Sequence, residues 1–307
     1  MVVYRGLDDP RLAARPAAVA VGNFDGLHLG HRKTLDRLCA LARKGRLRSL
    51  VLTFAPHPER ALGRSSVRMI DTPDERLERL RATCVDAVVV TPFNAEFSRL
   101  SCGDFVEGVL RRKLGAREVV VGAGFRFGRR RRGGTAELRS LGRQSGMGVH
   151  VVPPARLDGR IVSSTAVRHL LDRGRVDEAA RLLGRPHEIR GRVVRGERRG
   201  RRLGFPTANL ETESEILPEG VFFSETVRAG RAYPSLTSIG TNPTFGRNRL
   251  SVETLLLDYR GSLYGAEVVV RLLRKVRPTR AFPSAEALAA RIRKDCAEAR
   301  AWFARRH

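Results

Sequence analysis

The sequence predicts an α/β protein of two domains: a parallel sheet covered by helices, then a compact antiparallel β-barrel with a terminal helix. Three observations predict this organisation. Short apolar runs alternate with helical patterns over the first half of the chain. Gly184 and Pro186 end the last of those helical patterns. Beyond them the strand signals are closely spaced, with turns between them, which is typical of a barrel.

Short apolar runs predict the strands of the first domain, which we expect to be Rossmann-like. They occupy residues 17–21, 50–54, 87–91, 118–122 and 148–152. Helical patterns lie between them at 32–43, 72–83 and 101–113. Such alternation is typical of a parallel sheet with helices on both faces, and ligands bind at the carboxyl ends of its strands. We expect the strand at 17–21 and its loop at the switch point, where the strand order reverses.

The second domain follows a helical pattern at 176–183, which Gly184 ends and Pro186 prevents from continuing. The expected domains are therefore 1–184 and 185–307. Barrel strands are predicted at 189–194, 220–228, 236–240, 251–259 and 266–275. A final helix from about Ser284 has an apolar face that we expect to pack on the barrel. That face is formed by Leu288, Ile292, Cys296, Ala299 and Phe303.

The composition is that of a globular protein with enough apolar residues for two cores. Of the 307 residues 42% are hydrophobic, and the length slightly favours two domains. No apolar run approaches the roughly 18 residues of a membrane helix, and the N-terminus lacks a signal-like apolar core. We therefore expect a cytoplasmic protein without a membrane partner.

The chain has four cysteines, and none of them forms a C-x-x-C pair: Cys39, Cys84, Cys102 and Cys296. We therefore expect all four to be reduced, mostly structural thiols.

The chain is strongly basic, with a formal net charge of +26 carried mainly by arginine. Such a field attracts polyanions. The arginines are scattered over the whole length, however, and aromatic residues make up only 6% of the chain. Because no basic surface interleaved with aromatic residues stands out, we expect no nucleic-acid partner. The sequence makes no prediction of the oligomeric state.

A glycine-punctuated loop with two histidines follows the first strand of the Rossmann-like pattern. Residues 21–31 read VGNFDGLHLGH, and a helical pattern begins directly after them. This order predicts a nucleotide site, because glycine lets the backbone approach a phosphate and a helix N-terminus attracts an anion. His28 and His31 are about one helical turn apart. Their imidazoles can donate to phosphate oxygens whose charge grows during an in-line displacement.

Three further segments of the first half combine chemistry-bearing residues with turn signals. In TFAPHP, residues 53–58, two prolines fix the directions of Phe54 and His57. VGAGFRFG, residues 121–128, is a second glycine-rich turn, and the four arginines after it hold phosphates or form a solvated loop. In IVSSTAVR, residues 161–168, hydroxyl groups cap a helix that begins near Ala166, and Arg168 lies one turn further in.

The segment 196–209, GERRGRRLGFPTAN, is the candidate site of the second half. Its glycines permit a tight phosphate loop, beside which Arg201 and Arg202 add positive charge. Thr207 and Asn209 are two residues apart, so an extended strand directs both side chains to the same side. A hydroxyl, an amide oxygen and nucleotide phosphates suit a magnesium ion.

Glu253 is the candidate general base of the second half. In SVETLLLD, residues 251–258, it shares a strand face with Leu255 and Leu257. A carboxylate at the start of an apolar stripe needs a partner or has a raised pKa, and a pKa near neutrality suits a base. The alternative is an exposed glutamate at the end of a strand.

The sequence resembles the bacterial bifunctional riboflavin kinase/FAD synthetases in order from Val19 to about Asp295. GNFDGLHLGH is similar to the signature of the HxGH nucleotidyltransferases, and GERRGRRLGFPTAN to the riboflavin kinase signature G-x-x-x-G-R-x-L-G-F-P-T-A-N. TFAPHP, VGAGFRFG and IVSSTAVR are similar to further segments of the family. The resemblance implies that the second domain phosphorylates riboflavin to FMN with ATP and Mg²⁺. It implies that the first domain transfers AMP from ATP to FMN, giving FAD and pyrophosphate.

The resemblance also implies residue roles. Glu253 is implied to take the proton of the ribityl hydroxyl, and His28 and His31 to steady the moving phosphates. ATP and its phosphates are implied to contact Gly22, Asn23, Phe24, Asp25, His57, Ser164, Thr165, Arg168, Gly196, Gly200, Arg202, Gly204 and Pro206. The flavin is implied to contact Gly124, Phe125, Thr244 and Phe245, and the metal Thr207 and Asn209. Residues 237–246 and 263–265 also match segments that line the flavin and nucleotide pocket.

Two glycines depart from the family pattern. Gly124 stands where the family usually has Asp or Asn, and Gly134 where an acidic residue is common. A site that lacks one such partner loses on the order of 1–3 kcal/mol if the other group stays buried. One alternative is therefore a riboflavin kinase with a degenerate adenylyltransferase domain. The other is a basic flavin- or nucleic-acid-binding protein without turnover.

Overall fold

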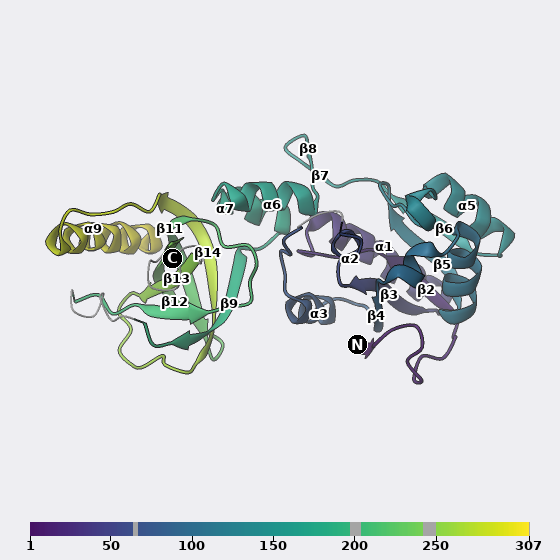
Figure 1. Ribbon diagram of the computed structural model, residues 1–307, viewed down its shortest axis with the longest axis horizontal. Coiled ribbons are helices and arrows are strands. Elements are labelled where there is room, and N and C mark those ends of the chain that lie inside the picture. Colours follow the sequence, from purple (N-terminus) through teal and green to yellow (C-terminus); the bar gives the residue numbers. More distant parts are fainter. Residues whose placement is uncertain (64–66, 197–203, 242–249, 307) are drawn as a thin grey trace. The chain divides into compact units, whose positions relative to one another are not determined.

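A parallel sheet and a closed barrel organise the chain (Figure 1). The structure is a computed structural model that describes residues 1–63, 67–196, 204–241 and 250–306. It divides into two units, residues 1–163 and 164–307. The helices between residues 164 and 183 group with the barrel, although they precede the boundary that the sequence predicts between 184 and 185.

The first unit is built on a parallel sheet with the strand order β1-β4-β3-β2-β5-β6. Its strands are β1 (Val2–Tyr4), β2 (Ala17–Val21), β3 (Arg48–Ala55), β4 (Ala87–Pro92), β5 (Ala116–Gly122) and β6 (Gly148–Val152). From β2 the chain adds β3 and β4 on one side and β5 and β6 on the other. The switch point therefore lies between β2 and β5, as predicted. The edge strand β1 was not predicted, because its three residues are too few to show a pattern.

Helices cover both faces of this sheet, because side chains alternate along each strand. Ala18 and Ala20 of β2 face the core under α1 (Leu29–Gly45) and α3 (Pro73–Arg81). Val19 and Val21 face the other core, under α5 (Thr135–Gln144) and η1 (Asp104–Lys113), whose hydrogen bonds are of the π-helical type. The predicted helices at 32–43, 72–83 and 101–113 are confirmed.

The remaining elements of the first unit are short and were not predicted. They are α2 (Pro58–Ala61), α4 (Ala95–Arg99), the 3₁₀ turn η2 (Arg129–Arg131) and the hairpin of β7 (Arg156–Leu157) and β8 (Arg160–Ile161). Each has too few residues to show a hydrophobic period. The ten-residue helix α5 was also missed.

The second unit begins with two helices and continues into the barrel. The helices are α6 (Ser164–Asp172) and α7 (Val176–Leu183), and α7 packs on β9 and β14. The strands are β9 (His187–Val194), β10 (Ala208–Glu211), β11 (Gly220–Arg228), β12 (Arg231–Thr241), β13 (Leu250–Leu256) and β14 (Glu267–Arg277). They close in the order β10-β13-β12-β11-β14-β9, and every neighbouring pair is antiparallel. The predicted barrel is confirmed.

The two faces of the barrel wall differ in chemistry. The outer face includes Phe223 and Leu255, which pack on the apolar face of α9 (Ala285–Ala304) as predicted. On the alternate positions, facing the inside, hydroxyl groups with no exposed surface are linked by hydrogen bonds of 2.8–3.1 Å. They belong to Ser224, Thr226, Ser235, Thr237 and Thr254. This internal network holds β11, β12 and β13 together.

The structure corrects the prediction that all cysteines are reduced. Cys39 on α1 and Cys84, shortly before β4, form a disulfide, whereas Cys102 and Cys296 are free. The partners are 45 residues apart in the sequence, and their Cα atoms lie 6.2 Å apart. Sequence spacing does not show this proximity, which arises because α1 and the segment after α3 pack on the same face of the sheet.

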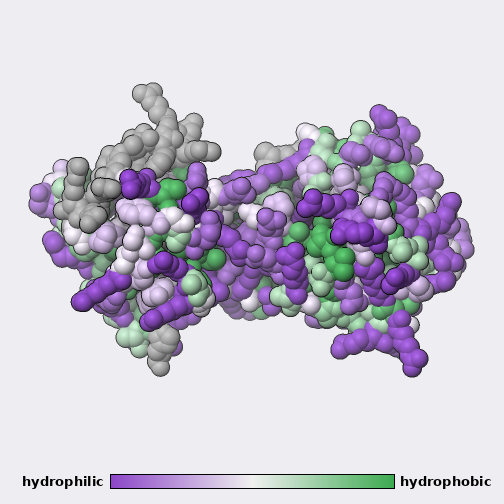
Figure 2. All heavy atoms as spheres, turned by 90° about the horizontal axis from the view of Figure 1, so that it is seen from below, coloured by the Kyte–Doolittle hydropathy of each residue, from purple (hydrophilic) through white to green (hydrophobic). Residues whose placement is uncertain are grey.

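Hydrophilic side chains cover most of the described surface that Figure 2 shows, with small hydrophobic areas between them. The large hydrophobic residues that are exposed within the described ranges are Met1, Val2, Ile161 and Tyr264. Within those ranges no helix has the length and apolar character needed to cross a membrane.

Candidate functional site

His28 and His31 lie against each other at the start of α1. Their rings stack with centroids 3.7 Å apart and an interplanar angle of 16°. His28 is the N-cap residue of α1, and its Nδ1 accepts a hydrogen bond of 3.3 Å from the main-chain N–H of His31. A neutral histidine that accepts at Nδ1 carries its proton on Nε2. The cap therefore sets the neutral tautomer of His28 at the end of the helix where anions are favoured.

Two glycines of this loop are required by the space around them. A Cβ added to Gly30 would lie 3.1 Å from both Nδ1 and Cε1 of His28. At Gly26 φ is +80°, and an added Cβ would lie 2.9 Å from Cδ1 of Ile70. The H-x-G-H spacing thus leaves room for the His28 ring against the first turn of the helix.

The end of β3 contacts the histidine loop through Asn23. Oγ1 of Thr53 donates to the main-chain oxygen of Asn23 at 3.1 Å, and Nδ2 of Asn23 lies 2.8 Å from Nε2 of His57. His57 is the N-cap of α2, where its Nδ1 accepts from the N–H of Glu59. Because β2 and β3 are parallel neighbours, their carboxyl ends meet at one edge of the sheet. The structure thus brings Asn23 and His57, two predicted ATP contacts, together.

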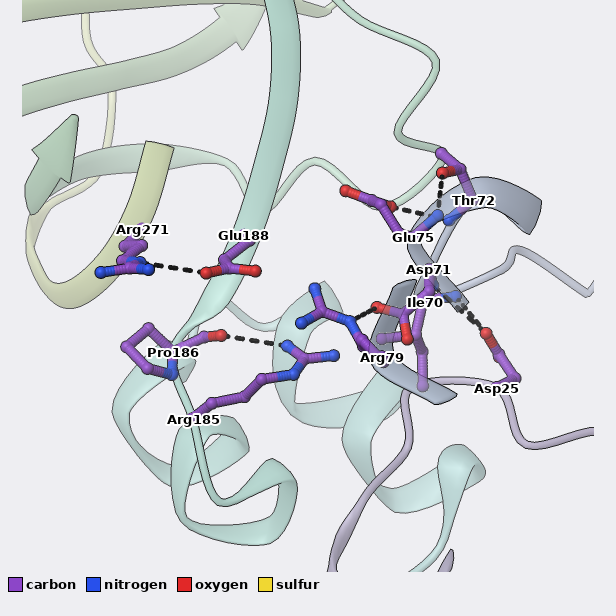
Figure 3. Close-up of polar contacts among 10 residues, drawn as sticks. All are labelled: Asp25, Ile70, Asp71, Thr72, Glu75, Arg79, Arg185, Pro186, Glu188 and Arg271. Carbon is purple, nitrogen blue, oxygen red and sulfur yellow. Dashed lines mark hydrogen bonds and ion pairs between the residues drawn. The ribbon is translucent and has the colours of Figure 1, made fainter. Parts of the chain in front are cut away.

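Two other predicted ATP residues have buried side chains. The phenyl ring of Phe24 is 1% exposed in the core under α1, with its centroid 5.2 Å from that of His31. The carboxylate of Asp25 is equally buried and accepts the main-chain N–H groups of Ile70 and Asp71 at 2.9 and 3.2 Å (Figure 3). These side chains shape the loop from the inside, and an ATP contact at these two positions stays a prediction.

The start of α3 is a part of this site that sequence reasoning missed. Asp71, which Asp25 holds, forms an ion pair of 3.0 Å with Arg79 (Figure 3). Thr72 and Glu75 form a capping box, in which each side chain accepts from the main chain of the other. The order T-P-D-E was the available signal, because Ser or Thr followed three residues later by Glu marks a helix start. The helix thus begins where the histidine loop anchors it.

The predicted flavin segment follows β5, the other neighbour of β2. Gly124 is exposed, and a Cβ added to it would meet nothing within 4 Å. Phe125 is half-buried and stacks on Phe127, with centroids 5.7 Å apart. Gly134 is the N-cap of α5 and makes no side-chain cap hydrogen bond. The two departures from the family pattern are therefore positions with no side-chain donor or acceptor, and at Gly124 there is room for one.

The arginine turn after β5 lies beside α2. Nη1 of Arg131 is 3.4 Å from Oε1 of Glu59, and both side chains are exposed. Arg130 and Arg131 have φ angles of 56° and 58°, a region that non-glycine residues seldom adopt. A phosphate role for this turn stays a prediction.

The predicted triphosphate residues Ser164, Thr165 and Arg168 belong to α6. The helix begins at Ser164, two residues before the predicted start. Thr165 follows in its first turn and Arg168 lies one turn further, as predicted. Main-chain N–H groups of a first turn suit an anion. A role of Ser164, Thr165 and Arg168 in triphosphate binding stays a prediction.

On the barrel, Thr207, Asn209 and Glu253 come together. Asn209 of β10 is the register partner of Glu253 of β13, and Oγ1 of Thr207 donates to Oε2 of Glu253 at 3.3 Å. All three side chains are half-buried on the outer face of the wall, which Glu253 shares with Leu255 as the sequence predicts. The structure therefore collects the predicted base and both predicted metal ligands in one place.

Glycines and a proline surround this cluster. A Cβ added to Gly196 would lie 2.3 Å from Nδ2 of Asn209, so a larger residue would displace that amide. Gly204 has a φ of +82° and is exposed, like Pro206. The other predicted contacts lie outside the described residues: Gly200, Arg202, Thr244 and Phe245.

Comparison with known proteins finds the same two parts. A family model described as FAD synthetase matches residues 11–166, and one described as riboflavin kinase matches residues 183–303. The bifunctional riboflavin kinase/FMN adenylyltransferase of Pseudomonas fluorescens is 36% identical, covering 98% of this chain and 97% of that protein. The enzyme of the same name from Escherichia coli K12 is 35% identical over 99% and 98%.

A solved structure also matches over the whole length. It is described as a macrolide-efflux protein from Streptococcus pneumoniae, and it superposes with a TM-score of 0.88 at 28% identity, covering 98% of this chain and 99% of that one. Macrolide efflux corresponds to neither of the two matching family models.

Proposed function

The chain belongs to the family of bifunctional riboflavin kinase/FMN adenylyltransferases, and we propose that the two residue groups described above divide its reactions between them. It is an enzyme that phosphorylates riboflavin to FMN with ATP and adenylylates FMN to FAD with ATP, releasing pyrophosphate. The observation that carries this function is that two different family matches follow each other along one chain. We assign residues 1–184 to adenylylation and 185–307 to phosphorylation, with the boundary at the helix stop of Gly184.

In adenylylation, a phosphate oxygen of FMN attacks the α-phosphorus of ATP, and the bond to the leaving pyrophosphate breaks. The attacking phosphate is already ionised, so the protein has to position the groups and stabilise charge rather than remove a proton. We assign that stabilisation to His28 and His31. Support comes from the N-cap bond, which leaves the proton of a neutral His28 on Nε2, and from the helix start beneath both rings.

In phosphorylation, the terminal ribityl hydroxyl attacks the γ-phosphorus of ATP and ADP leaves. We assign the removal of the hydroxyl proton to Glu253. Support comes from its position at the end of the outer apolar face and from the hydrogen bond of Thr207, which orients the carboxylate.

We assign Mg²⁺ to Thr207 and Asn209. A hydroxyl oxygen and an amide oxygen beside a carboxylate form an oxygen-only donor set, which fits magnesium together with nucleotide phosphates. Among the described residues no cluster of three or more His, Cys, Asp or Glu offers an alternative cage. When bound, the ion neutralises phosphate charge and orients the γ-phosphate for attack. The position of Gly196 against Asn209 holds the amide in place for this role.

ATP supplies both reactions and FMN links them, which favours a cytoplasmic location and needs no nucleic-acid or membrane partner. The test is chromatographic product analysis after the purified chain is mixed with riboflavin, ATP and Mg²⁺. We expect FMN first and FAD later. FMN alone, even after FMN is supplied as substrate, would establish the kinase with a degenerate adenylyltransferase domain. If neither riboflavin nor FMN is converted, the remaining alternative is a flavin- or nucleic-acid-binding protein without turnover.

A further inference from the structure

Arg76 is a buried arginine that no motif of the sequence singles out. It lies on α3 and is only 4% exposed. Within the described ranges its guanidinium makes one hydrogen bond, of 3.1 Å, from Nη1 to the main-chain oxygen of Asn23. Burial lowers the pKa of Arg76, while the nearby carboxylates of Asp25 and Asp71 raise it.

A buried charge with so few partners is expensive. Removing a cation from water costs several kcal/mol unless it is well paired, and an apolar side chain of similar length would fill the same space without that cost. Asp25 is occupied by two main-chain N–H groups, and Asp71 by Arg79. The two carboxylates therefore act on Arg76 through their charge, while its hydrogen bond goes to the carbonyl of Asn23.

That carbonyl is held by two donors from different elements. Thr53 at the end of β3 and Arg76 on α3 each donate to it at 3.1 Å. The peptide bond between Asn23 and Phe24 is trans, so the N–H of Phe24 points opposite to the carbonyl of Asn23. In the described part of the chain this N–H makes no hydrogen bond. Holding the carbonyl between two buried donors therefore fixes the direction of an unused N–H donor on the opposite side of the peptide.

The groups on either side of this peptide belong to the candidate adenylylation site. The side chain of Asn23 contacts His57, and the ring of Phe24 lies beside His31. Phe24 has a φ of 51°, which non-glycine residues seldom adopt, so the peptide needs external support to keep its orientation. A cation on the carbonyl also polarises the amide and makes its N–H a stronger donor.

Resting on the proposed adenylyltransferase function, we propose that Arg76 is a positioning residue, which holds the Asn23–Phe24 peptide so that the Phe24 N–H is presented to a phosphate of the bound nucleotide. Arg76 itself touches no substrate. It acts through the carbonyl of Asn23, together with Thr53, from the side of the loop that faces the core.

The test compares variants of Arg76 with a matched change on the same helix. In Arg76→Met we expect kcat for FAD formation from FMN to fall about 10- to 100-fold, the effect of a misplaced donor, with a smaller change in KM for FMN. Arg76→Lys should recover part of the rate, because an ammonium group can donate to the same carbonyl. Arg81→Met removes an exposed charge from α3 without touching Asn23 and should leave the rate unchanged.

Two further measurements separate positioning from folding. Thr53→Val removes the other donor to the carbonyl at nearly constant volume, so it should lower the same kcat even if Arg76→Met is unstable. Riboflavin phosphorylation by the same preparations measures the amount of protein with an active second unit, to which each rate of FAD formation is normalised. Thermal unfolding of each variant completes the comparison.

The proposal is overturned if folded Arg76→Met forms FAD as fast as Arg81→Met. It is equally overturned if Arg76→Lys recovers nothing and Thr53→Val has no effect, since Arg76 would then only fill space. If the unaltered chain forms no FAD from FMN, it is the adenylyltransferase function that fails, and this outcome is visible before any variant is made.

Discussion

Nδ1 of His28 accepts the main-chain N–H of His31 at 3.3 Å, and the two imidazoles stack with centroids 3.7 Å apart. The first histidine of the H-x-G-H motif is thus also the cap of the helix that carries the second. A change of the His28 side chain alters the start of α1 as well as the donors offered to a phosphate, whereas a change of the His31 side chain leaves the cap in place. This coupling shapes the first two predictions.

We expect His31→Ala to lower FAD formation about 100- to 1,000-fold, the usual cost of losing one donor to a developing negative charge. The main-chain N–H of residue 31, which donates to the N-cap residue His28, remains in this variant, so α1 should stay folded. FMN formation from riboflavin should be unchanged. Both rates are measured on one preparation by chromatography, and an unaltered FAD rate would remove His31 from the proposed mechanism.

Gly30→Ala tests the space beside the His28 ring. Its new Cβ would lie 3.1 Å from Nδ1 and Cε1 of His28, so the ring has to shift by a few tenths of an ångström. We expect a loss of FAD formation of about 10-fold or more from this misplacement. Gly108→Ala is the matched control, because nothing lies within 4 Å of its Cβ. Equal rates in the two variants would show that the ring position is unimportant.

Gly124→Asn tests the departure from the family pattern by a gain of function. Nothing lies within 4 Å of a Cβ at this position, so the side chain fits without strain. If a flavin or nucleotide group there lacks a partner, a new hydrogen bond of about 1 kcal/mol should lower KM by roughly 5-fold. Steady-state kinetics with FMN and with ATP shows which substrate is affected. Unchanged constants for both would show that the site does not need this side chain.

Glu253→Gln removes the proposed base while keeping the shape of the side chain and its contact with Thr207. We expect FMN formation to fall at least 100-fold, as for loss of a general base, while FAD formation from supplied FMN continues. Leu255→Val on the same strand face is the control for barrel packing. A kinase rate within a few-fold of the original would exclude Glu253 as the base.

Because of the disulfide, we expect the number of cysteines that react with a thiol reagent to rise after reduction. Denatured protein kept without reductant should react at two cysteines, Cys102 and Cys296, and after reduction at all four. In the folded protein both free thiols should react slowly at neutral pH, because burial raises the pKa of each and leaves less thiolate. Cys84→Ser should lower the free energy of unfolding under non-reducing conditions by about 2–4 kcal/mol. Four reactive thiols before reduction would contradict the disulfide.

Local patterns were enough to predict the parallel strands, the switch point at β2 and the antiparallel barrel. They were enough because each depends on the period of apolar residues or on turn signals within a few positions. The H-x-G-H loop and the pair Thr207 and Asn209 were predicted for the same reason. The short elements α2 and β7 carried too few residues for a period, and α5 was missed although it has ten.

The sequence by itself determined the two fold types, their order along the chain and the segments that carry the chemistry. Only the tertiary structure decided which distant residues meet: Cys39 with Cys84, Glu253 with Asn209, and Arg76 with the carbonyl of Asn23. It also showed that Phe24 and Asp25 turn their side chains into the interior. The physical reason is that periodicity records which face of an element is buried, whereas the partner across that face depends on the packing of elements far apart in the chain.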